Sequence, residues 1–299
     1  MRTATLALLT SVTLVWFSTA QAADLDYGVL RGPDYEPASA EIDWNGFYFG
    51  AHAGYSSASL GFKNAYKDML LDEIHDTTGE TIFNASTLLR QGSRRIDSTT
   101  FGGFAGYNYQ FDEIVIGIEV DYTSFNGSGT VSGVTGRSKI LESGLFEAVE
   151  VGAKSSTKIN DYGTIRARAG YVIGNFLPFI TGGLAIGRAK VEDKVNYKDY
   201  GFDQAAYLAN QTSGKNSDIY NFGYQFFNQN NPNSSIPGDT PLTRTKTKVV
   251  GGVTLGGGLE FALTQNILLR GEYQYVLFND FDGHTVNINT VRGGAAVKF

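Results

Sequence analysis

Apolar and polar side chains alternate strictly along several segments of the chain. Between Ile114 and Tyr122, every even position holds an apolar residue or tyrosine, whereas the charged residues Glu119 and Asp121 lie at odd positions. Successive side chains of a β-strand point to opposite faces, so a period of two predicts a strand with one apolar and one polar face. The same pattern recurs in the segments 99–111, 165–173, 249–263, 267–277 and 291–299. The chain is therefore predicted to consist mainly of β-strands.

Two further segments bring the expected number of strands to eight, and the connections between the strands alternate in length. One segment runs from about Trp44 to Ser57, and the other, less regular, runs from about Pro178 to Val191. Tight connections are expected at 111–113, 174–178 and 264–266, and long ones at 58–97, 125–158, 192–245 and 279–287. Short turns on one rim and long loops on the other are typical of an outer-membrane barrel.

The N-terminus carries the pattern of an export signal. Arg2 precedes an apolar run from Ala4 to Phe17, and Ala20-Gln21-Ala22 has the small residues of a cleavage site. The apolar run has 14 residues, fewer than the roughly 20 that a membrane-spanning helix needs. We therefore expect residues 1–22 to be a signal peptide that is removed after Ala22.

Export and alternation together predict a transmembrane β-barrel. In lipid every backbone N–H and C=O group must be paired internally, so only helices and closed sheets can span a bilayer. The predicted fold class is all-β: an eight-stranded, antiparallel, up-and-down barrel that spans the membrane, with short periplasmic turns and long external loops. The barrel is expected over 44–299, and the acidic, proline-containing segment 23–43 is expected to be a periplasmic linker.

Composition narrows the classes of function. The chain has 37 Gly, 17 Tyr and 20 Phe but no Cys, so disulfide and thiolate chemistry are excluded. Its formal charge of −6 becomes −7 once Arg2, the only charge in residues 1–22, is removed. An acidic balance argues against nucleic acid as a partner, because phosphate binding requires clustered Lys and Arg.

Charged residues occupy the polar, inward-facing side of the expected strands. Four are acidic and four are basic: Glu119, Asp121, Glu260 and Glu272, with Arg166, Arg168, Arg270 and Arg292. Equal numbers of opposite charges in a narrow lumen predict a hydrogen-bonded network, because a buried charge without a partner is costly. A catalytic pair of carboxylates is the alternative, but an eight-stranded interior filled by side chains leaves a substrate little room. No enzymatic activity is expected.

Other candidate sites are weaker. His52 is expected to face the lumen, while His75 and His284 are expected in external loops, where either one could bind haem singly. Their spacing does not match a metal site, so no metal or cofactor is expected. Asp280-Phe281-Asp282-Gly283 resembles the start of a calcium loop but lacks the acidic residue at the twelfth position, which favours a turn.

External segments carry the features of recognition surfaces. Residues 68–74 have the pattern of a short amphipathic helix. Aromatic residues at 220–227 lie among Asn and Gln, and could extend strands above the membrane. Such a surface suits recognition of proteins or sugars, and it suits a packed loop core equally well.

The strand motifs resemble those of a known family. Trp44-Asn45-Gly46-Phe47-Tyr48-Phe49-Gly50 and the following Ala51-His52-Ala53-Gly54-Tyr55 resemble the opening strand of small porin-like outer-membrane proteins of rhizobial and related alpha-proteobacteria. Phe101–Gln110, Gly170-Tyr171 and Gly293–Phe299 are similar to the family's second, fourth and closing strands. The resemblance implies an outer-membrane location and lipid contacts, and it implies that the terminal Phe299 is the signal for the barrel-assembly machinery.

The leading hypothesis for function is a structural, surface-exposed role in the cell envelope. A narrow porin-like channel for small solutes is one alternative, although wide aqueous pores belong to barrels of about 16–18 strands. The other is an adhesin or haem-binding protein that meets host or environmental ligands through its external loops.

Overall fold

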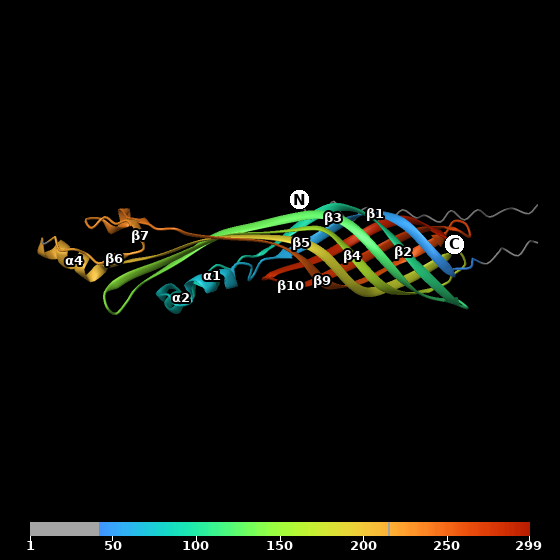
Figure 1. Ribbon diagram of the computed structural model, residues 1–299, viewed down its shortest axis with the longest axis horizontal. Helices are drawn as coiled ribbons and strands as arrows, with labels where there is room; N and C mark the ends of the chain where they lie inside the picture. Colours follow the sequence, from blue (N-terminus) through green and yellow to red (C-terminus); the bar gives the residue numbers. More distant parts are fainter. Residues whose placement is uncertain (1–41, 215) are drawn as a thin grey trace, which may run out of the picture. The chain divides into compact units, whose positions relative to one another are not determined.

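Eight long antiparallel strands form a closed ring in the computed structural model, which describes residues 42–214 and 216–299 (Figure 1). Their bounds are β1 Gly46–Gly61, β2 Ser93–Phe111, β3 Ile114–Ile140, β4 Leu145–Tyr171, β5 Phe176–Asp203, β9 Thr240–Ala262, β10 Ile267–Phe281 and β11 His284–Lys298. The order around the ring is β4-β3-β2-β1-β11-β10-β9-β5, and pairing of β4 with β5 closes it. The predicted eight-stranded up-and-down barrel is confirmed. The predicted signal peptide lies outside the described residues, as does all but the end of the predicted linker.

The connections on one rim are short, as the sequence predicts. β2 and β3 join through Asp112 and Glu113, and the other two short connections are 172–175 and 263–266. Asp112 adopts the left-handed conformation (φ 48°), which a tight hairpin requires and which Asp tolerates better than most residues. This rim is the periplasmic one.

The opposite, external rim carries the remaining secondary structure. The β1–β2 connection holds α1 (Lys67–Ile74), α2 (Thr78–Phe83) and α3 (Ala85–Leu88), and α1 confirms the short amphipathic helix expected there. The β5–β9 connection holds α4 (Gln204–Ser213), β6 (Asn221–Phe222), β7 (Tyr224–Phe226), a 3₁₀ turn (Pro232–Ser234) and β8 (Ile236–Pro237). None of the helices among the described residues is long and apolar enough to cross a membrane.

Two segments expected to be long loops are not loops. Residues 125–158 continue β3 and β4 as a hairpin that turns at 141–144, and residues 279–287 hold only a two-residue turn at Asp282 and Gly283. Asp282 (φ 55°) and Gly283 (φ 79°) both adopt the left-handed conformation, so this segment is a hairpin turn. In these two segments the strands have no apolar outward face. The strands within the lipid do have one, and the sequence prediction depended on it.

Beyond the barrel, β3, β4, β5 and β9 continue as a four-stranded sheet, here called the external arm (residues 127–140, 145–160, 188–203 and 240–250). The helices α1–α3 cover one face of the arm, and Figure 1 shows α1 and α2 beside it. Leu70 and Ile74 of α1 are buried there against Val149, Val151 and Val195 of the arm. Burial of this apolar face is what holds the short helices on the sheet, since helices of this length are marginal by themselves.

The apolar side chains change face where the strands leave the lipid. On β5, Leu184 and Ile186 point outward, whereas Ala189 and Val191, a few residues further on, are fully buried inside. The outward positions there are Arg188 and Lys190. Below this boundary the outside is lipid and above it the outside is water, so the same alternation has opposite polarity in the two halves of one strand.

Aromatic side chains flank the outward apolar band. Near the periplasmic rim, aromatic pairs lie on the outer surface: Phe47 with Tyr107, Tyr109 with Phe111, Phe49 with Phe299, and Phe176 with Phe261. Near the external boundary, Tyr55, Phe101 and Tyr122 are more than half exposed. Aromatic girdles at both interfaces are typical of outer-membrane barrels.

The interior of the barrel has three layers. A cluster that includes Trp44, Phe104 and Leu177 fills the periplasmic end. A second cluster, which includes Leu60, Phe125 and Phe278, fills the external end. Eight buried charged residues from β3, β4, β9, β10 and β11 lie on the strand positions between these two apolar layers.

Candidate functional site

The eight charged residues that the sequence singles out all point into the barrel and are buried. Glu119 and Asp121 come from β3, Arg166 and Arg168 from β4, Glu260 from β9, Arg270 and Glu272 from β10, and Arg292 from β11. Each is at most 6% exposed. Adjacent strands place them side by side: the register pairs Glu119 with Arg166, and Glu260 with Arg270. We call these eight residues the lumen layer.

Carboxylates and guanidinium groups alternate in one continuous network of contacts through the lumen layer. Arg292 Nη1 lies 2.9 Å from Asp121, and Arg292 Nη2 lies 3.0 Å from Glu272. Arg166 then connects Glu272 to Glu119. Arg270 Nη2 is 2.7 Å from Glu119, its Nε donates to Glu260 at 2.7 Å, and Arg168 donates to Glu260 at 2.8 Å.

Every charge in the lumen layer thus has at least one partner of opposite sign. A buried guanidinium that bridges two carboxylates compensates the loss of hydration better than a single pair, because its planar fork directs separate donors at each. Four negative and four positive groups leave the lumen layer neutral. This neutrality is what makes so many charges tolerable inside a lipid-embedded barrel.

Tyr48 and His52 of β1 contact the lumen layer. The Tyr48 hydroxyl donates to Glu119 Oε2 at 2.8 Å and accepts from Arg168 at 2.9 Å, and His52 Nε2 lies 2.9 Å from Asp121. His52 therefore faces the lumen, as expected from its strand position. The part that Tyr48 plays was missed, although its even position among the outward-facing Phe47 and Phe49 was a signal that it points inward.

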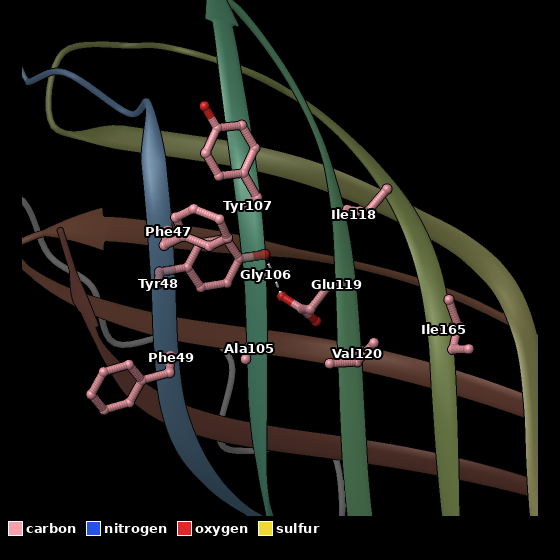
Figure 2. A pocket seen from close by; sticks show the side chains of 10 residues that line it. All are labelled: Phe47, Tyr48, Phe49, Ala105, Gly106, Tyr107, Ile118, Glu119, Val120 and Ile165. Carbon is pink, nitrogen blue, oxygen red and sulfur yellow. Dashed lines mark hydrogen bonds between the residues drawn. The ribbon is translucent and has the colours of Figure 1, made fainter.

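A glycine makes the contact between Tyr48 and Glu119 possible. Figure 2 shows Tyr48 of β1 and Glu119 of β3 joined across Gly106 of β2, with Phe47 and Tyr107 nearby. The three residues form one cross-strand row. A Cβ at Gly106 would lie 2.4 Å from the Tyr48 hydroxyl and 2.6 Å from the Ile118 carbonyl oxygen, so the row has no room for a larger residue.

Aromatic rings inside the barrel pack against two of the guanidinium groups. The Arg270 guanidinium lies 4.0 Å from the centre of the Phe104 ring, and that of Arg168 lies 4.6 Å from the Phe179 ring. Both distances are within the range of cation–π attraction. The rings therefore contribute to holding the two guanidinium groups in place.

His284 is not in an exposed loop, and this expectation was wrong. It is fully buried where β11 begins, with Nδ1 2.7 Å from the Thr157 hydroxyl and Nε2 3.1 Å from Asp193. Arg244 in turn donates to Asp193 at 2.9 Å. The error has the same cause as the missed turn at 282–283, because at this height polar residues face outward and His284 shares the inward face with Val286 and Ile288.

His75 and the acidic residues are the remaining sequence candidates for a metal or haem site. Within residues 42–214 and 216–299, no three or more His, Asp or Glu side chains are grouped so that they could hold a metal ion. His75 is exposed at the end of α1 and lies 3.0 Å from the exposed Asp76.

Phe299, expected to serve as an assembly signal, is 70% exposed, stacks on Phe49 and donates its N–H to the Phe47 carbonyl at 2.8 Å.

Comparison with known proteins gives two relatives that match over nearly their whole length and one that matches over about two thirds of its length. The chain is 28% identical over 311 residues to the 31 kDa outer-membrane immunogenic protein of Brucella melitensis, covering 98% of each chain. It is 25% identical to the 25 kDa outer-membrane immunogenic protein of Brucella ovis, covering 100% of each. It is 29% identical to the 22 kDa outer membrane protein of Rhizobium leguminosarum, over 67% of this chain and 66% of that one.

Among solved structures, neisserial surface protein A is similar over 85% of this chain and 98% of that chain, with 13% identity and a TM-score of 0.37. The family model for the outer membrane protein beta-barrel domain matches residues 36–299, which include the whole ring of strands and the lumen layer. The protein resides in the outer membrane, and its chain belongs to the outer membrane protein beta-barrel domain family.

Proposed function

We propose that this protein is a closed, non-enzymatic barrel with a structural role in the outer membrane, and that it presents the external arm at the cell surface. The observation that carries the proposal is the layered interior. A neutral, fully paired layer of charges lies between two apolar clusters that fill the two ends of the barrel. Such an interior stabilises the barrel and opposes the passage of solutes.

The external features support a surface role. The arm and the β5–β9 connection expose apolar side chains to the outside, including Val134, Ile140, Tyr220 and Phe226, each more than half exposed. Apolar and aromatic surfaces outside the lipid are typical of recognition sites. The Brucella relatives are named immunogenic proteins, which is consistent with a surface that is accessible from outside.

Solute flux separates the structural role from a channel. Refolded protein is inserted into liposomes, and the efflux of small solutes is compared with that of liposomes treated with boiled protein. We expect efflux to match the boiled control. Efflux above that control, with insertion verified by the heat-dependent electrophoretic shift, would replace the structural role with a narrow channel.

An adhesin is the second candidate, and the exposed apolar residues of the external connection favour it. Haem capture is less favoured, because His284 is buried and paired, which leaves His75 as the exposed histidine among the described residues. Binding of intact cells that express the protein to host-matrix proteins and to haemin tests both. Cells that express a variant without residues 206–236 provide the control.

The C-terminal residue is proposed to guide assembly. Phe299 is exposed to the lipid side and its ring stacks on Phe49 at a centroid distance of 5.5 Å, so it contributes little to the interior. We expect Phe299→Ala to lower the amount of folded protein in the outer membrane while leaving refolding into detergent nearly unchanged. Equal losses in both measurements would assign Phe299 a role in stability instead.

A further inference from the structure

Lysines form a compact group on the outward face of the external arm, directly above the apolar band. Lys158 of β4 is paired in register with Lys190 of β5, and Lys154 is paired with Lys194. All four are exposed. We call these four residues the lysine belt.

Hydroxyl side chains flank both lysine pairs. The register across the arm reads Ser128, Lys158, Lys190, Thr247 in one row and Ser132, Lys154, Lys194, Thr243 in another. Between them lies the row Thr130, Ser156, Glu192, Thr245. Each lysine pair is therefore set among groups that donate hydrogen bonds to an anion.

The lysine belt is short of negative charge. Glu192 lies 2.9 Å from Lys194, and that contact lowers the pKa of Glu192. Within the part of the chain that the structure describes, no ion pair joins Lys154, Lys158 or Lys190 to a carboxylate. Like charges directly opposite each other on neighbouring strands are destabilising, so this arrangement costs stability unless an anion binds. It occurs in a chain whose formal charge is −6.

The position of the belt is that of lipid headgroups. On β5 the outward side chains change from Leu184 and Ile186, at 65% and 57% exposure, to Arg188 and then Lys190. Tyr122, of the external girdle, hydrogen bonds to Asp161, which in turn pairs with Arg188. The lower lysine row thus follows immediately after the membrane boundary.

The upper lysine row lies further from the membrane and borders a groove. Lys194 follows Lys190 by four residues, a rise of about 13 Å along a strand. A groove of about 430 Å³ crosses the arm at this height, lined by Lys154, Lys194, Ser132 and Thr243 together with Val134 and Pro241. The cations thus lie at two heights, and the higher pair lies beside a groove with polar and apolar walls. This arrangement matches a headgroup that carries several phosphates on sugar rings better than a headgroup with one phosphate.

We propose that the lysine belt binds a phosphorylated glycolipid of the outer leaflet, with phosphates at the two lysine pairs and sugar in the groove. The barrel then carries a lipid on the side of β4 and β5. Hydroxyl groups of the flanking Ser and Thr complete the coordination of the phosphates.

The test uses the complete barrel refolded in a non-ionic detergent, with diphosphorylated lipid A as the probe and native mass spectrometry as the readout. We expect wild-type protein to retain lipid A. The variant Lys154→Gln/Lys158→Gln/Lys190→Gln/Lys194→Gln should bind on the order of a thousandfold more weakly, because each of the four lysines near an anionic surface contributes about 1 kcal/mol. The four positions are exposed, so the electrophoretic shift of the folded barrel should persist.

A matched variant removes four other exposed cations: Arg94→Gln/Arg95→Gln/Arg137→Gln/Lys139→Gln. It should bind lipid A like the wild type. The proposal is overturned if the belt variant binds like the wild type, or if the matched variant loses as much affinity. Equal binding of dephosphorylated lipid A or of phosphatidylglycerol would also overturn it, as would full displacement by inorganic phosphate.

Discussion

Two groups of charges, the lumen layer and the lysine belt, follow opposite rules. In the lumen layer, four carboxylates and four guanidinium groups alternate so that Glu119 and Arg166 face each other across neighbouring strands. In the lysine belt, β4 and β5 place Lys154 opposite Lys194. The lumen layer is buried and neutral, whereas the belt is exposed and has an excess of positive charge.

The difference shows how the surroundings decide what a charge can do. Inside the barrel an unpaired charge would cost several kcal/mol, so each must find a partner within the protein. Above the lipid, water and counterions reduce that cost, and like charges can remain adjacent and be available to a ligand. A balanced set therefore indicates a structural role, and an unbalanced exposed set indicates a binding surface.

Removing one member of the lumen layer should have the largest effect. Arg166→Met leaves Glu119 and Glu272 without their shared partner, and we expect a loss of about 3–5 kcal/mol in the free energy of unfolding. Urea titration of the barrel in lipid vesicles measures it. A loss no greater than that of Lys158→Gln would mean that the two groups do not differ in the way the structure indicates.

A side chain at Gly106 should displace Tyr48 and so lower the stability of the barrel without removing a charge. Gly106→Ala would push Tyr48 away from Glu119, and we expect a loss of about 1–3 kcal/mol in the free energy of unfolding. Gly271→Ala is the matched control, because a Cβ there meets nothing within 4 Å. Equal stability of the two variants would show that Tyr48 can be displaced at no cost.

Asp199 lies on the helix-covered face of the external arm. It is less buried than the lumen layer and less exposed than the lysine belt. Burial raises its pKa above the ordinary value of 3.8, and the nearby Glu147 raises it further. Tyr197 donates to Asp199 at 3.1 Å, and Gly79 of α2 packs against both side chains.

Because the folded state holds the proton of Asp199 more strongly, its contribution to stability is complete below the unfolded pKa and is lost as the pH rises through the raised value. We expect amide exchange in α2, corrected for the intrinsic rate, to be faster at about pH 7 than at about pH 4. Asp199→Asn should remove most of this dependence. A corrected rate that is the same at both pH values in the wild type would contradict the prediction.

Removing one charge from the lysine belt should have the smallest effect on stability, and of the opposite sign. In detergent without anionic lipid, Lys154→Gln relieves repulsion from Lys194, so the free energy of unfolding should rise, by about a tenth of the Arg166→Met effect. Added lipid A should reverse the sign, since the wild type then gains the ligand. A loss of stability without lipid would mean that Lys154 has a partner within the protein.

Much of the barrel can be predicted from the alternation of its strands. Ile114–Tyr122 and Ile267–Leu277 have apolar residues on one face and charges on the other, and the parity of each strand predicts the face on which the eight buried members of the lumen layer lie. The external strands were missed because their outward residues are Ser, Thr and Lys, which are equally common in loops. His284 was misplaced for the same reason.

Sequence by itself determined the fold class, the outward and inward faces of the strands within the lipid, and the equal numbers of buried charges. It did so because these depend on local periodicity and on the requirement that buried charges balance. Tertiary structure alone decided which arginine meets which carboxylate, and which lysines lie opposite each other. Those depend on register between strands far apart in the sequence, such as β1 and β11, where Arg292 lies beside His52 although 240 residues separate them.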